Sequence, residues 1–209
     1  MSRVLVQTGA LTASAYRELH ARKLFWFTLA LSGLVVACFA ALGINKEGVT
    51  ILWWTLEVPG VNTSTFSEAT FYKLLFVSLG ISIWLSWVAV ALALISTSTI
   101  FPELVAGGSI DVVLSKPISR LRLFLTTYVL GLLFVALQVT VFCLASFLVI
   151  GVRGGAWEPG LFLAVPVVLA MFSYLYAVLV LCGVVTRSAI AALLLTALFW
   201  LLLFMVNTA

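Results

Sequence analysis

The chain has 209 residues, of which 64% are hydrophobic and only 9% are charged, and its mean hydropathy is +1.27. This composition excludes a soluble domain and indicates a protein whose solvent is lipid. The net charge of +4 is explained by membrane insertion, so no nucleic-acid partner is needed to account for it.

Five uncharged apolar runs are each long enough to cross a bilayer, which takes about 20 residues. We therefore expect an all-α integral membrane protein, with residues 1–209 forming a single transmembrane domain. The expected spans are residues 24–45, 74–100, 123–152, 160–186 and 188–207. Because Arg187 alone separates the last two, they are expected to form a tight helical hairpin.

Residues 1–23 precede the first span and are mixed in character. Leu11, Ala15 and Leu19 form a stripe at a spacing of four, which favours a helix lying on the inner leaflet. Arg22 falls on the same stripe, so a solvated basic flank fits the segment equally well.

The orientation follows from Lys and Arg near the span ends, because these residues are retained on the cytoplasmic side. Eight basic residues fall on one side of the predicted membrane and three on the other, which predicts a cytoplasmic N-terminus and places the segment from Asn45 to Tyr72 outside. The eight are Arg3, Arg17, Arg22, Lys23, Lys116, Arg120, Arg122 and Arg187; the three are Lys46, Lys73 and Arg153.

Spans two and three carry the polar side chains of interest within the membrane. Ser78, Ser82 and Ser86 share one helical face. Small residues of this kind let helices pack closely in lipid, which is the reading the pattern favours; the alternative is a mildly polar wall along a substrate path or a dimer seam. Gln138 in span three needs a hydrogen-bond partner and should face protein rather than lipid.

The expected spans contain no Asp, Glu, Lys, Arg or His. Carriers driven by an ion gradient place such groups in the membrane, so this mechanism is not expected here. The sequence has no phosphate-binding loop, zinc motif or nucleophile elbow, and its three cysteines lie singly in the spans. We expect no catalytic residues, no metal and no cofactor bound by this chain, and any energy must come from another polypeptide.

The cytoplasmic segment, residues 101–122, is the polar connection between spans two and three. Ser109 can cap a short helix over residues 110–114, and Lys116-Pro117 ends it. The helix would offer apolar knobs within a charged rim, a pattern that fits a groove on a soluble partner. Its charges could also be ordinary solvated or topology-setting groups. The knobs are Ile110, Val113 and Leu114, and the rim is Glu103, Asp111, Lys116 and Arg120.

The run from Gly107 to Asp111, followed by Val113-Leu114-Ser115-Lys116-Pro117-Ile118-Ser119-Arg120, resembles the first cytoplasmic loop of type-2 ABC transporter permeases. Tyr16–Lys23 more loosely resembles the elbow before their first span. The resemblance implies pairing with a second copy or a homologous permease, and with ABC ATPase subunits that bind ATP and magnesium. The short helix would be the coupling helix, contacting the ATPase through Glu103, Ser109, Ile110, Asp111, Val113, Leu114, Ser115, Lys116, Pro117 and Arg120.

Permeases of this family usually have six spans, whereas five are expected here. The resemblance thus implies either a sixth span after Ala209 or a departure from the family plan.

Two functions remain open at this stage. The first is a transmembrane permease subunit, not itself an enzyme, in a bacterial inner membrane, through which a separate ATPase drives substrate export or mechanical transmission. The alternative is a non-transport anchor or assembly subunit of a respiratory or cell-envelope complex.

Overall fold

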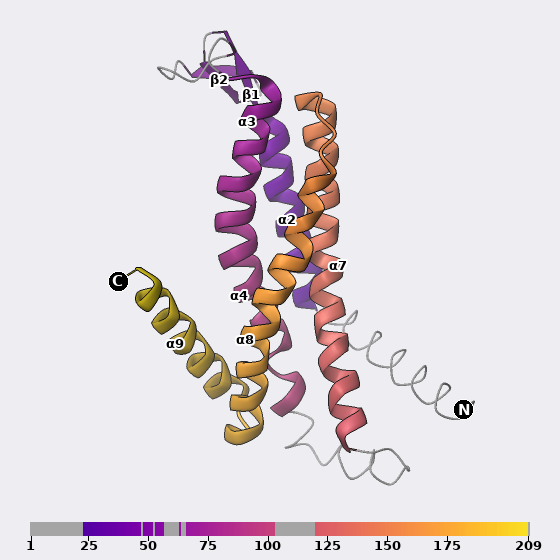
Figure 1. Ribbon diagram of the computed structural model, residues 1–209, viewed down its shortest axis with the longest axis vertical. Coiled ribbons are helices and arrows are strands. Elements are labelled where there is room, and N and C mark those ends of the chain that lie inside the picture. The colour runs from indigo at the N-terminus through magenta and orange to yellow at the C-terminus, as the bar shows by residue number, and fades with distance from the viewer. Residues whose placement is uncertain are drawn as a thin grey trace, which may run out of the picture. The chain divides into compact units, whose positions relative to one another are not determined.

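The computed structural model describes residues 23–46, 48–51, 53–56, 63, 66–102 and 120–208. The protein is mostly helical (Figure 1). Within the described ranges, four helices are long and apolar enough to cross a membrane: Glu68–Pro102, Leu121–Gly154, Pro159–Thr186 and Ala189–Val206. These helices confirm a helical membrane protein.

The first apolar helix, α2, covers Lys23–Ala41 and leads directly into a small sheet. Strands β1 (Leu42–Asn45), β2 (Gly48–Ile51) and β3 (Trp54–Leu56) pair antiparallel in that order. The span expected to run to residue 45 therefore ends at Ala41, because the next four residues form their hydrogen bonds with β2. Trp53 and Trp54, which follow β2, are highly exposed.

A continuous helical stretch runs from Glu68 to Pro102 and contains three successive helical elements. Helix α3 (Glu68–Leu75) is followed by the π-helix η1 (Phe76–Ala89) and by α4 (Val90–Thr97). The stretch begins six residues before the expected span, because Ser67 caps it: its hydroxyl accepts a hydrogen bond of 3.2 Å from the Thr70 backbone N–H.

The remaining helices agree closely with the expected spans. Helix α7 covers Arg120–Gly154, and a short 3-10 helix, η2 (Pro159–Leu163), leads into α8 (Ala164–Thr186). Helix α9 covers Ala189–Thr208. The tight connection between α8 and α9 is confirmed: it consists of Arg187, which has a positive φ of 52°, and Ser188.

Residue contacts divide the chain into two compact units. Of the described residues, the first unit holds 23–25, 90–102, 120–135 and 169–208. The second unit holds 26–46, 48–51, 53–56, 63, 66–89 and 136–168.

The core of the second unit is aromatic. The ring of Phe142 on α7 stacks with those of Phe76 and Trp84 on η1, at centroid distances of 6.3 and 6.4 Å. The ring of Phe39 on α2 meets Phe142 edge-on at 6.5 Å. Such ring pairs add packing energy beyond the burial of their area, and they join three helices here.

Candidate functional site

The predicted coupling helix lies outside the described residues. Positions 103–119 are not described, and Arg120 is described only as the first backbone residue of α7. All ten predicted ATPase contacts, from Glu103 to Arg120, therefore stay predictions. The two helices that this segment connects end in the first unit, and their packing there is described.

An aromatic cluster holds the two ends of the segment together. Phe101 is the first residue of the cytoplasmic segment (residues 101–122) and Phe124 follows the segment, and their ring centroids are 5.3 Å apart. The buried Tyr176 ring of α8 lies 6.2 Å from Phe101 and stacks on Tyr128 at 5.0 Å and on Phe172 at 5.2 Å. The aromatic cluster, defined as these five residues, packs the two span ends and α8 as one layer.

Hydrogen bonding and close approach strengthen the same layer. The hydroxyl of Tyr128 donates a hydrogen bond of 3.0 Å to the backbone carbonyl of Ser173 and lies 3.0 Å from its hydroxyl. A Cβ at Gly183 of α8 would lie 3.3 Å from Pro102 Cγ, so this glycine lets Pro102, near the start of the cytoplasmic segment, pack on α8. Pro102 and the aromatic cluster therefore pack the ends of two helices against α8.

The predicted serine face is present on η1, with Ser78 and Ser82 exposed and Ser86 half-buried. Their hydroxyls donate to carbonyl groups of their own helical stretch, at 2.6, 2.9 and 2.8 Å. Two of these bonds, from Ser82 to Val77 and from Ser86 to Ile81, reach back five residues, as the wide turns of a π-helix require. A role along a substrate path or a dimer seam remains a prediction.

Gln138 is buried in the second unit, which confirms that it faces protein rather than lipid. It lies four residues from Phe142 and eight from Ser146, so the three share one face of α7. Within the described residues, the Gln138 Nε2, the Ser146 hydroxyl and the Nε1 of Trp84 have no hydrogen-bond partner. The sequence did not identify Trp84 and Ser146 as buried polar residues. The four-residue spacing of Gln138, Phe142 and Ser146 could have predicted that these three share one helical face.

The second unit also carries a groove that sequence reasoning missed. Its cavity is about 370 Å³ and lies between η1 and the η2–α8 junction. Lys73 Nζ and Glu158 Oε1, 2.5 Å apart, form an ion pair that belongs to its lining. Lys73 lies on α3, and Glu158 directly precedes η2. Because the two residues are 85 positions apart in the chain, the sequence did not predict that they form an ion pair.

Within the described ranges, no three His, Cys, Asp or Glu side chains gather where they could hold a metal ion. The three cysteines are free thiols.

Comparisons of the chain with models of known protein families, with curated proteins and with solved structures find no match.

Proposed function

We propose that the chain is the transmembrane permease subunit of an ATP-driven ABC transporter. It would couple ATP hydrolysis by a separate ATPase subunit to substrate export or to mechanical transmission across the membrane. The proposal is supported by the sequence motif of residues 107–120, which falls between two helices long enough to span a bilayer.

The observation that carries the proposal is the aromatic cluster at the base of this segment. The Phe101–Phe124 contact joins the two span ends, and Tyr176 adds α8 to them. An ATPase that moved the coupling helix would thereby move three membrane helices together, rather than bend one flexible loop.

The partners follow from the same proposal. The energy would come from an ATPase that binds ATP and magnesium, because the expected spans hold no Asp, Glu, Lys, Arg or His that could draw on an ion gradient. A second copy of this chain, or a homologous permease, completes the membrane part.

The proposed arrangement in the inner membrane has a cytoplasmic N-terminus and five spans. Four of these spans are the four long helices, and the remaining span, which comes first in the chain, is α2. Its 19 residues give a length of about 28 Å at a rise of 1.5 Å per residue, close to the roughly 30 Å of the hydrocarbon core.

The test is affinity purification of the tagged chain from its native membrane, followed by mass spectrometry of the subunits that co-purify with it. The double variant Asp111→Ala/Arg120→Ala should lose a co-purifying subunit that contains a phosphate-binding loop, while its membrane insertion stays intact. The matched control, Lys46→Ala/Glu68→Ala, removes one basic and one acidic residue, both exposed, and should retain that subunit.

Retention of the ATPase by the double variant at the wild-type yield would reject the coupling helix. Recovery of electron-transfer subunits, with no ATPase, would instead favour a membrane anchor.

A further inference from the structure

The groove of the second unit has one polar end and two apolar walls. One wall is formed by Phe76, Val77 and Ile81 of η1, and the other by residues from Gly160 to Val168. Apart from Lys73 and Glu158, every described residue that lines it is apolar or a glycine. Val77 and Val167 are more than half exposed, so the groove opens toward the surroundings of the helices.

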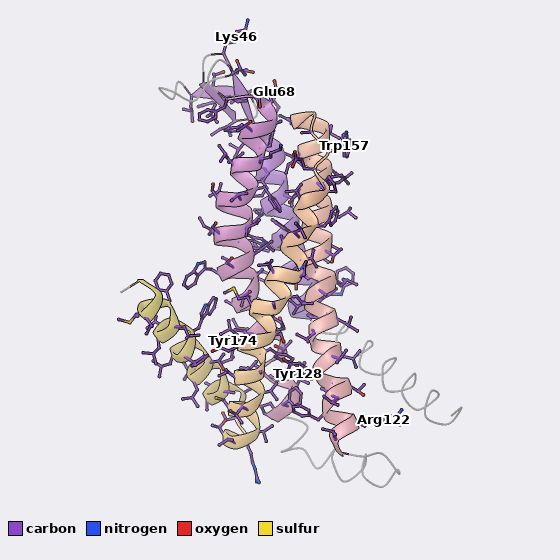
Figure 2. The ribbon with its side chains drawn as sticks, viewed as in Figure 1. Lys46, Glu68, Arg122, Tyr128, Trp157 and Tyr174 are labelled. Carbon is purple, nitrogen blue, oxygen red and sulfur yellow. The ribbon has the colours of Figure 1, made fainter. Side chains whose placement is uncertain are left out.

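The charged end lies at the expected depth of lipid headgroups. Lys73 directly precedes the span predicted at residues 74–100, and Glu158 lies just before the span predicted at 160–186. The neighbouring Trp157 is more than half exposed, and tryptophan is enriched where a membrane meets water. In Figure 2, Trp157 and Glu68 lie toward the same end of the second unit.

The ion pair is open to exchange with a ligand. The side chains of Lys73 and Glu158 are 40% and 49% exposed, and ion pairs at this exposure contribute little to stability. A headgroup that satisfied both charges could replace the direct contact without leaving a buried charge unpaired.

We propose that this groove binds one phospholipid with a phosphoethanolamine headgroup. One acyl chain would lie between η1 and α8, with the lipid phosphate on the Lys73 ammonium and the lipid ammonium on the Glu158 carboxylate. Charge complementarity selects this class, because an anionic headgroup meets repulsion from Glu158 and a choline headgroup has no N–H to donate.

The acyl chain itself supplies little selectivity. Lipid tails are as apolar as the groove walls, so exchanging one apolar neighbour for another brings no hydrophobic gain in the membrane. The preference should therefore depend on the two charges, while the shape of the walls decides whether a chain fits.

Native mass spectrometry of the purified chain in mild detergent tests the proposal. The lipids added are equal amounts of phosphatidylethanolamine, phosphatidylglycerol and phosphatidylcholine with matched acyl chains. The wild type should retain phosphatidylethanolamine about tenfold over the other two, as expected for charge-assisted hydrogen bonds.

Two charge variants distinguish the roles of the pair. Glu158→Gln should shift the preference toward phosphatidylglycerol, because Lys73 then meets an anionic headgroup alone. Lys73→Gln should lower retention of phosphatidylethanolamine without raising that of phosphatidylglycerol. The ratio between lipids in one spectrum does not depend on protein yield, and Lys46→Gln, a change at an exposed lysine outside the groove lining, should leave it unchanged.

A third variant tests the walls. Val77→Phe fills the groove and should reduce retention of all three lipids, whereas Val185→Phe, at an exposed site of α8 outside the groove, should not. Equal retention of the three lipids by the wild type, or an unchanged preference in Glu158→Gln, would overturn the proposal. A lipid-free dimer whose formation is blocked by Val77→Phe would overturn it in favour of a second copy.

Discussion

Gly131 makes room for Tyr176 in the aromatic cluster. A Cβ at Gly131 would lie 2.5 Å from the Tyr176 hydroxyl and 2.9 Å from its Cζ, and this tyrosine is fully buried. Gly131→Ala should therefore destabilise the protein by about 1–3 kcal/mol, because the ring has to shift in a packed interior. The midpoint of thermal unfolding in detergent measures this change.

Gly33→Ala is the matched control, because a Cβ there has nothing within 4 Å. It should be neutral, or stabilising by up to about 1 kcal/mol, since alanine is the better helix former. Equal midpoints for the two variants would contradict the close packing of Gly131 on Tyr176.

At single residues, the sequence predicted burial better than it predicted specific contacts. The burial of Gln138 was predictable, because a lone amide in an apolar span must avoid lipid. The roles of Gly131 and Trp84 were not, since a glycine or an aromatic residue within an apolar run reveals nothing about which ring from another helix it will meet.

At the scale of elements, one hydrogen bond connects α3 to the sheet. The Tyr72 hydroxyl donates to the backbone carbonyl of Leu42 in β1, at 2.7 Å (Figure 1 shows both elements). Tyr72→Phe should cost about 1 kcal/mol and loosen β1 and β2. Hydrogen exchange of residues 42–45 and 48–51 should become faster, because these residues pair in the sheet and pairing protects their amides.

Tyr174→Phe serves as the control for this variant, since Tyr174 is an exposed residue of the first unit. It should leave exchange in residues 42–45 and 48–51 at the wild-type rate. An unchanged rate in Tyr72→Phe as well would show that the bond to Leu42 does not hold the sheet.

The elements differ in how well sequence predicts them. Long helices were predicted because an apolar run of span length leaves the backbone no other way to satisfy its hydrogen bonds in lipid. The sheet was missed, because strands of three or four residues are too short for an alternating pattern and Leu42–Asn45 continues an apolar run. The Lys73–Glu158 pair depends on α3 lying close to the residue before η2, 85 positions later in the chain, which no local pattern encodes.

For the whole molecule, the proposed function requires one orientation in the membrane. An ATPase in the cytoplasm can reach residues 101–122 only if the N-terminus is cytoplasmic as well, because one pair of spans separates the two segments. The bias of eight basic residues against three predicts this orientation.

Labelling with a membrane-impermeant maleimide in cells checks this orientation, in a background where Cys38, Cys143 and Cys182 are replaced by alanine. Lys46→Cys, at an exposed position after β1, should be labelled in intact cells. Arg3→Cys should be labelled only after the membrane is permeabilised. The reverse pattern would place residues 101–122 on the outer side, where no ATP-hydrolysing partner could dock, and the transporter proposal would fail while the lipid groove would remain testable.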